Sequence, residues 1–127
     1  MKRYALALML AALSCTAMAA WQQVADDSDT VGYYDPDSVL RDTNGVTVSE
    51  LNDFKRVATT VNDTLFRSTT MQAVYDCGSA QVRVLTVQPY SDQMGQGNAL
   101  ATMNVDGEWQ PILAGTTRAE IFSLVCR

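Results

Sequence analysis

Residues 67–77 read RSTTMQAVYDC, and their pattern is the clearest sign of the fold in this sequence. From Met71 onward, a set made of Met, Ala, Tyr and Cys alternates with a second, mostly polar set. This is the two-residue period of a β-strand with one face buried. We therefore expect an inner strand that carries Cys77 on its inward face.

The C-terminal residues change to a helical period. Thr117 and Glu120 have the spacing of a capping box, in which the side chain of each residue bonds to the backbone N–H of the other. Apolar residues then recur at helical spacing in the range 121–125. We expect a helix that begins at Thr117, lies on a sheet, and brings Cys126 close to Cys77.

The rest of the chain is typical of short strands joined by turns. Asp35 followed by Pro36 predicts one capped helical turn, and Asn44-Gly45 predicts a tight hairpin. Short strands with one late helix predict an α+β domain. The expected strands are residues 31–34, 39–41, 46–54, 67–77, 81–90 and 98–103.

Two places interrupt this pattern. The apolar phase slips between Val48 and Leu51, which predicts a β-bulge near Ser49-Glu50. The segment Lys55–Leu65 is polar and rich in threonine, and we expect it to form a surface loop.

The first 19 residues resemble an export signal rather than part of the fold. Lys2 and Arg3 precede an apolar run, and Ala17-Met18-Ala19 offers small residues for cleavage before residue 20. We expect residues 1–19 to be a secretory signal peptide and residues 20–127 to form a single domain. Loss of the two cations changes the net charge from −5 to −7.

A lipoprotein signal with Cys15 as the modified residue is the alternative reading of this segment. It fits less well, because the residue three positions before Cys15 is not a large aliphatic one.

Cys77 and Cys126 form an even pair in an exported chain, so a disulfide between them is expected. A redox-active pair fits poorly, because the chain has no C-x-x-C motif and no Lys or His beside either cysteine. A metal site would need further Cys or His ligands.

Composition argues against several function classes. The chain contains no histidine, so it lacks the usual acid–base group at neutral pH and the commonest metal ligand. An acidic protein also lacks the basic patch that nucleic-acid binding requires. Asp26, Asp27 and Asp29 lack the spacing and the bidentate glutamate of a calcium loop. Catalysis by Glu50 and Glu108 would need a cleft and a raised pKa that no pattern indicates, so we expect no enzyme, cofactor or metal.

Several short motifs occur in a recognisable order across residues 21–127. They are Tyr33-Tyr34-Asp35-Pro36, Ser38-Val39-Leu40-Arg41, Tyr75-Asp76-Cys77, Tyr90 before Met94-Gly95-Gln96-Gly97, Trp109-Gln110-Pro111-Ile112, and a final helix ending at Cys126. In this order and spacing the chain resembles the surface-adhesin protein E-like domain family of Gram-negative bacteria. The resemblance implies a curved antiparallel sheet of about six strands, with a helix packed on it and one disulfide.

The resemblance also implies a function without catalysis. Named members of the family sit at the outer membrane or cell surface and bind host proteins such as vitronectin, laminin and plasminogen. We therefore expect an exported binding module that contacts a protein partner, located in the periplasm or at the outer-membrane surface. The alternative is a soluble periplasmic accessory or stress protein with no host ligand.

Four residues are candidates for partner contact. Tyr33 and Tyr34 are adjacent, so one side chain of the pair should face inward and the other outward. Lys55 and Arg56 are the basic residues of the expected loop. An exposed edge strand could also pair two copies of the chain, so a homodimer is possible.

Overall fold

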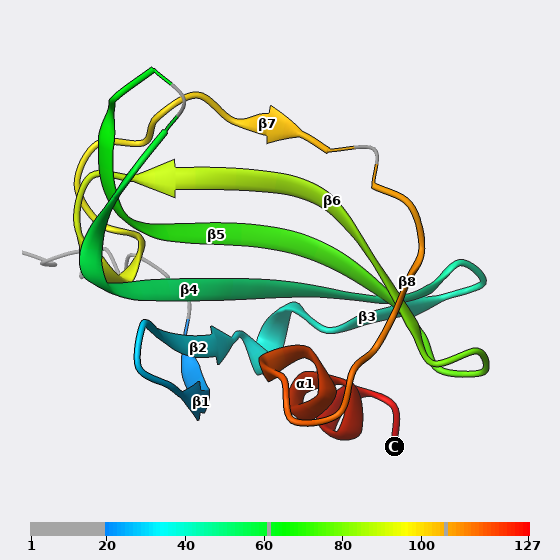
Figure 1. Cartoon of the computed structure of the whole chain (residues 1–127). Coiled ribbons are helices and arrows are strands. Elements are labelled where there is room, and N and C mark those ends of the chain that lie inside the picture. The colour runs from blue at the N-terminus through cyan, green and yellow to red at the C-terminus, as the bar shows by residue number, and fades with distance from the viewer. Residues whose placement is uncertain (1–19, 61, 106) are drawn as a thin grey trace, which may run out of the picture.

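An open antiparallel sheet forms the body of the protein (Figure 1). In the computed structural model, which describes residues 20–60, 62–105 and 107–127, eight strands pair in the order β1-β2-β4-β5-β6-β7, with β3 on β4 and β8 on β6. The expected signal peptide, with Cys15, lies outside the described residues. The elements are β1 (Gln22–Asp26), β2 (Thr30–Tyr34), η1 (Pro36–Ser38), β3 (Leu40–Asp42), β4 (Gly45–Thr59), β5 (Leu65–Asp76), β6 (Gln81–Tyr90), η2 (Gln93–Gly95), β7 (Met103–Asn104), β8 (Gln110–Pro111) and α1 (Thr117–Val125).

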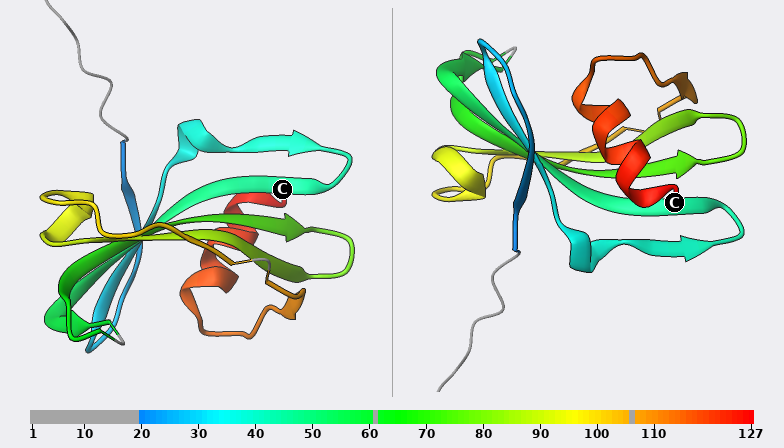
Figure 2. Two further views of the ribbon diagram at one scale, coloured as in Figure 1. Left: turned by 90° about the horizontal axis from the view of Figure 1, so that it is seen from above. Right: turned by 90° about the horizontal axis from the view of Figure 1, so that it is seen from below.

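The sheet is curved, and α1 lies across one face near the end that carries the β3–β4 hairpin (Figure 2). This arrangement confirms the expected α+β class and the curved antiparallel sheet with a C-terminal helix; six strands form the main path of the sheet, and β3 and β8 lie off it. No helix in the described part of the chain is long and apolar enough to span a bilayer.

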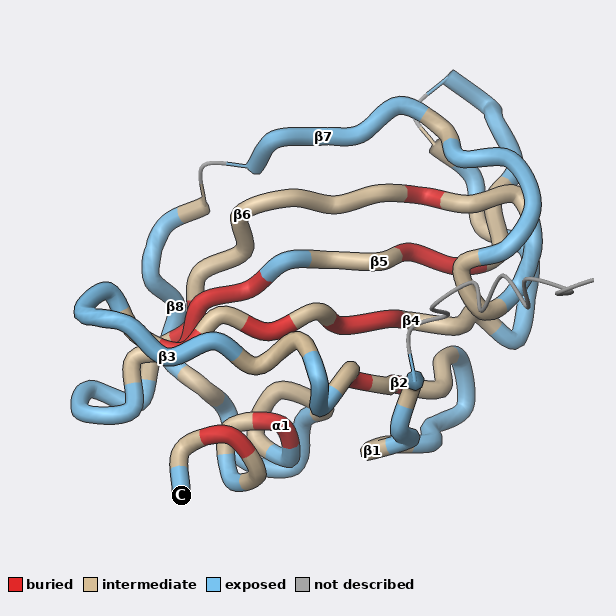
Figure 3. The backbone as a smooth tube through the Cα atoms, turned by 180° about the vertical axis from the view of Figure 1, so that it is seen from behind, coloured by how far each residue is buried: buried red, intermediate tan, exposed pale blue. Residues whose placement is uncertain are grey.

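The core lies between α1 and the sheet. Val46 on β4 is paired directly with Tyr75 on β5, and opposed residues of antiparallel strands point to the same face. Figure 3 shows buried segments on both central strands and on the helix. The buried core consists of Tyr34, Val46, Val48, Ala73, Tyr75, Val82, Ile121 and Val125.

A disulfide joins the helix to the sheet, as expected. Cys77 directly follows β5 and Cys126 directly follows α1, and their Cα atoms are 5.5 Å apart. The Arg41 Nη1 group donates a second link, a 2.5 Å hydrogen bond to the carbonyl of Val125. The C-terminal end of the helix is therefore attached to both β3 and β5.

The expected capping box is wrong by one residue. The N-cap of α1 is Thr116, whose hydroxyl oxygen accepts a 3.2 Å hydrogen bond from the backbone N–H of Ala119. The first turn is positioned by close packing on β2: a Cβ at Gly32 would lie 2.5 Å from Thr117 Cγ2. Glycine at this position lets the helix approach the sheet.

The predicted bulge near Ser49-Glu50 is also wrong. Pairing of β4 with β5 is continuous from Val46 to Asp53, and the register shifts between Asp53 and Ala58 instead. The apolar residues of β4 change sides after Glu50, because from Leu51 onward the opposite face of the strand is the covered one. Leu51 is buried on the face opposite α1, where its Cδ1 lies 3.3 Å from a Cβ placed at Gly95 of η2.

The expected loop Lys55–Leu65 is mostly strand. β4 continues to Thr59 and β5 begins at Leu65, so only residues 60–64 connect them. The expected strand 98–103 is largely irregular, with an isolated bridge from Ala99 to Tyr90 before β7 begins. Pairing with β5 makes the end of the first segment a strand, whereas the second segment pairs with β6 only through the Ala99 bridge and β7.

Candidate functional site

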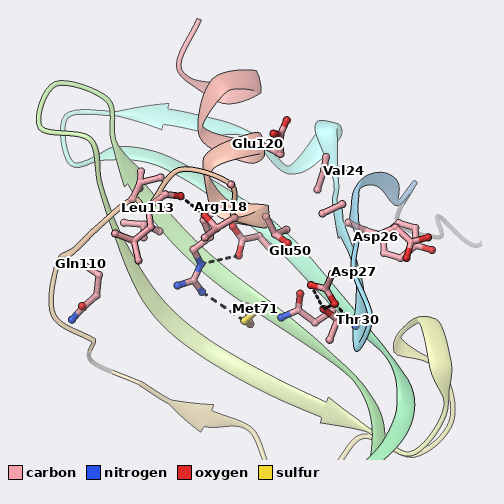
Figure 4. Close-up of a pocket in the computed structure, with 18 of the residues that line it drawn as sticks. Val24, Asp26, Asp27, Thr30, Glu50, Met71, Gln110, Leu113, Arg118 and Glu120 are labelled. Carbon is pink, nitrogen blue, oxygen red and sulfur yellow. Dashed lines mark hydrogen bonds and ion pairs between the residues drawn. The ribbon is translucent and has the colours of Figure 1, made fainter.

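A hollow of about 810 Å³ opens beside α1, on the helix-covered face of the sheet (Figure 4). One wall is the β1–β2 hairpin, and the opposite wall is the segment of residues 110–116 that leads into the helix. Glu50 of β4 and Met71 of β5 lie at the base, and Arg118 of α1 extends over them. A volume of this size falls in the range of small-molecule sites, about 300–1,000 Å³.

A buried carboxylate forms the base of the hollow. Glu50 is 3% exposed, and its Oε1 atom accepts a hydrogen bond from the Tyr75 hydroxyl on the neighbouring strand. Its Oε2 atom lies 3.8 Å from Arg118 Nε. Burial raises the pKa of the Glu50 carboxyl, against the lowering effects of the Tyr75 hydrogen bond and the Arg118 charge. Burial and the adjacent Glu50 also raise the pKa of Tyr75.

Arg118 remains accessible to a ligand. Its side chain is 33% exposed, and its Nη2 group lies 4.0 Å from Met71 Sδ, which is a weak acceptor. Within the described residues the guanidinium makes no hydrogen bond to an oxygen atom. Its planar set of N–H donors is therefore available for a carboxylate or another oxygen acceptor.

The hairpin wall of the hollow is acidic. Asp27 Oδ1 accepts 2.8 Å hydrogen bonds from the backbone N–H groups of both Asp29 and Thr30. These bonds favour the ionised form and hold the pKa of Asp27 below its ordinary value. Asp26 is paired with Lys55, whose Nζ is 2.5 Å from Asp26 Oδ1 and 2.5 Å from the carbonyl of Asp27.

The sequence profile of the family described as surface-adhesin protein E matches residues 21–127. The chain belongs to the surface-adhesin protein E family.

Solved structures share the fold of this adhesin family member. A structure of Haemophilus influenzae protein E superposes with a TM-score of 0.67 at 14% identity, covering 86% of this chain and 85% of that one. A second crystal form gives 0.64 at 15% identity, covering 81% and 91%. Protein E from non-typeable Haemophilus influenzae gives 0.65 at 14% identity, covering 88% and 78%. No curated protein matches the chain significantly.

The four predicted contact residues do not form one cluster in this adhesin-family fold. The side chain of Tyr34 is buried in the core, whereas Tyr33 is partly exposed and is paired with Leu51, whose side chain lies on the face opposite α1. Lys55 is tied to the acidic β1–β2 hairpin, and Arg56 is exposed on β4 beyond it. The buried side chain of Tyr34 is out of reach of a partner in this fold.

Sequence analysis missed the cluster formed by Glu50, Tyr75 and Arg118. The structure shows both a hollow and a raised pKa at Glu50, which no sequence pattern indicated. One signal was present: Glu50 follows Val46 and Val48 at two-residue intervals on β4, so its side chain points to the same inward face. A carboxylate at an inward position of a strand needs partners, and these come from distant parts of the chain.

Proposed function

We propose that the chain is an exported, non-enzymatic binding module that contacts a protein partner through its hairpin arm. The hairpin arm is defined as residues 54–67, the far end of β4 and the start of β5. Membership of an adhesin family supports a binding role. The exposed apolar residues of the arm support its choice as the contact surface.

Exposed apolar side chains on this arm are the observation that carries the proposal. Val57 is 48% exposed and Leu65 is 61% exposed. Leu65 is paired with Thr59, and Val57 lies two residues before Thr59, in the stretch where the register of β4 shifts. Both apolar side chains are exposed on the same short stretch of the arm. Exposed aliphatic groups that gather on one surface are typical of a contact site.

The base of the arm is stiffened by two aromatic rings. Phe54 and Phe66 stack edge to face, with their ring centroids 5.5 Å apart. A stiff arm loses less conformational freedom when it binds.

Charge indicates the kind of partner. Lys55 and Arg56 are consecutive cations on the arm; Lys55 is paired with Asp26, whereas Arg56 is exposed and makes no ion pair within the described residues. The arm therefore suits a partner surface that combines acidic and apolar groups. If the protein is exposed on the cell surface, a host extracellular-matrix or serum protein fits this description, and Tyr33 is a further candidate for contact.

The test is binding of the purified domain to immobilised vitronectin, laminin and plasminogen. We expect Arg56→Ala alone to weaken binding, the double variant Lys55→Ala, Arg56→Ala to weaken it about tenfold, and Leu65→Ser to weaken it further. Arg127→Ala is the matched control, because this exposed cation lies at the C-terminus, away from the arm. Unchanged binding by the arm variants would exclude the arm as the contact surface.

Cell fractionation tests the alternative function. Protection of the protein from added protease in intact cells, with full release in the periplasmic fraction, would favour a periplasmic accessory protein without a host ligand.

A further inference from the structure

We propose that the hollow beside α1 is a second binding site, separate from the hairpin arm, and that it takes short peptides. The peptide carboxylate lies on Arg118, and a positively charged group of the peptide faces Asp27 on the opposite wall. The two groups lie on different sides of the same hollow (Figure 4).

Arg118 is placed to bind the carboxylate of the peptide. Glu50 holds the guanidinium over the base of the hollow, but its Oε2 lies 3.8 Å from Nε, beyond hydrogen-bond distance. The Arg118 side chain is one-third exposed, and within the described residues its other N–H groups make no hydrogen bond to an oxygen atom. Arginine recognises carboxylates through two parallel N–H donors, and this geometry leaves such donors for a ligand.

Asp27 on the acidic wall is placed to face the positively charged group of the peptide. Lys55 pairs with Asp26 and donates to the backbone carbonyl of Asp27, but it makes no hydrogen bond to the Asp27 carboxylate. That carboxylate is held ionised by its own turn, and the contact of its Oδ2 atom with the Thr30 hydroxyl, at 3.3 Å, leaves lone pairs for a further donor. The carboxylates of Asp27 and Glu50 would repel a doubly charged anion such as phosphate. A molecule that carries both a carboxylate and an ammonium group complements both sides of the hollow.

Apolar surface between these charged groups suits a peptide. Leu113 is 65% exposed at the rim, and Val24, Met71 and Ile112 add apolar surface to the walls and base. Such surfaces accept side chains between the two ends of a short peptide.

The test is isothermal titration of the folded domain with the tetrapeptide Lys-Leu-Val-Ala. We expect saturable binding by the peptide with a free carboxylate, and binding about ten to a hundred times weaker by its C-terminal amide, because one charge-assisted contact is lost. The N-acetylated analogue Gln-Leu-Val-Ala should also bind more weakly. Equal affinity for the acid and the amide, or no saturable binding at millimolar concentration, would overturn the proposal.

Variants locate the site on the protein. Arg118→Met should reduce affinity to the level of the amide peptide, and Arg127→Met should not. Because Arg118→Met leaves buried Glu50 without its cation, the double variant with Glu50→Gln provides a folded comparison. Binding by either Arg118 variant at the level of the unmodified protein would overturn the assignment.

Two further measurements fix the ligand class and the independence of the site. Hexanoate should compete poorly, because it has no positive group; competition at equal concentration would indicate a site for simple carboxylates and overturn the peptide assignment. Arg56→Ala should leave peptide affinity unchanged, whereas the same variant weakens contact through the hairpin arm. The two proposals can therefore fail separately.

Discussion

The two ends of the sheet are stabilised in different ways. At the α1 end, apolar side chains fill the space between helix and strands, and the disulfide fastens the helix to the end of β5. At the opposite end, η2 lies on the other face of the sheet, over the buried side chain of Leu51, and three hydrogen bonds with side chains hold it there. The hairpin arm extends from this second end.

The polar end depends on two side chains that bind backbone groups. The hydroxyl of buried Ser68 donates a 2.6 Å hydrogen bond to the carbonyl of Asp92 and accepts a 2.9 Å bond from the N–H of Gly95. Asp53 accepts a 3.0 Å bond from the N–H of Met94. Directional contacts of this kind hold η2 in place beside the buried side chain of Leu51.

This difference between the two ends predicts that one end mainly stabilises the fold and the other mainly contacts a partner. The α1 end contains most of the buried apolar surface, so changes there should act mainly on global unfolding. The arm end exposes Val57 and Leu65, so changes there should act mainly on binding and on local opening. Variants at the two ends should therefore differ in whether they change global unfolding or local opening.

Cys126→Ser should produce the largest loss of stability. Opening the link between α1 and β5 frees a long loop in the unfolded chain, and the expected cost is about 2–5 kcal/mol. Thermal unfolding under non-reducing conditions measures it. Ser123→Ala, on the exposed side of the same helix, is the control and should leave the melting temperature almost unchanged. An unchanged melting temperature for Cys126→Ser would show that the α1 end does not depend on its disulfide.

Ser68→Ala should have a smaller effect at the other end. Two backbone groups of the η2 region lose their partner, at a cost of about 1–3 kcal/mol. Hydrogen exchange at the amide of Gly95 should accelerate more than exchange at the core amides of β5. Ser79→Ala, in the exposed turn after β5, is the control. Uniform acceleration across the sheet would mean that the two ends unfold together.

Local signals in the sequence predicted most of the elements. Alternation predicted β5, the bounds of β6 are those expected, and Asp35 caps η1 by accepting from the N–H of Asp37. The hairpin at Asn44-Gly45 is present, although its two loop residues are Thr43 and Asn44, one position earlier. These features depend on residues that are close in sequence, which is why short patterns were sufficient.

Long-range contacts account for the errors. A polar segment, residues 55–59, became strand because β5 pairs with it, and pairing outweighs weak strand propensity. Leu51 was misread because no local pattern shows that η2 covers the face opposite α1. The candidate site was missed for the same reason, since Glu50 and Arg118 meet only after the helix packs on the sheet.

Glu50→Gln should have the smallest effect on stability, and its sign should depend on pH. Burial raises the pKa of Glu50 in the folded state above its ordinary value of 4.5, so between these two pKa values the folded protein binds more protons than the unfolded chain. The contribution of protonated Glu50 to stability is therefore complete below pH 4.5 and is lost as the pH rises through the folded-state pKa. Glutamine still accepts from the Tyr75 hydroxyl and avoids the cost of burying a charge. At pH 7 the variant should equal the unmodified protein in stability or exceed it by about 1 kcal/mol, and this advantage should shrink towards pH 4.5.

Urea unfolding at pH 7 and pH 4.5 measures the two differences, with Glu108→Gln as the control for loss of one exposed negative charge. A Glu50→Gln variant that is clearly less stable at pH 7 would mean that attraction to Arg118 outweighs desolvation. Arg118 would then be a structural partner of Glu50 at the α1 end, with fewer donors to offer a ligand. A variant of equal or greater stability would mean that Glu50 positions Arg118 while the N–H donors of Arg118 stay available to a ligand. The smallest change in stability thus decides whether the α1 end only maintains the fold or also presents a binding site.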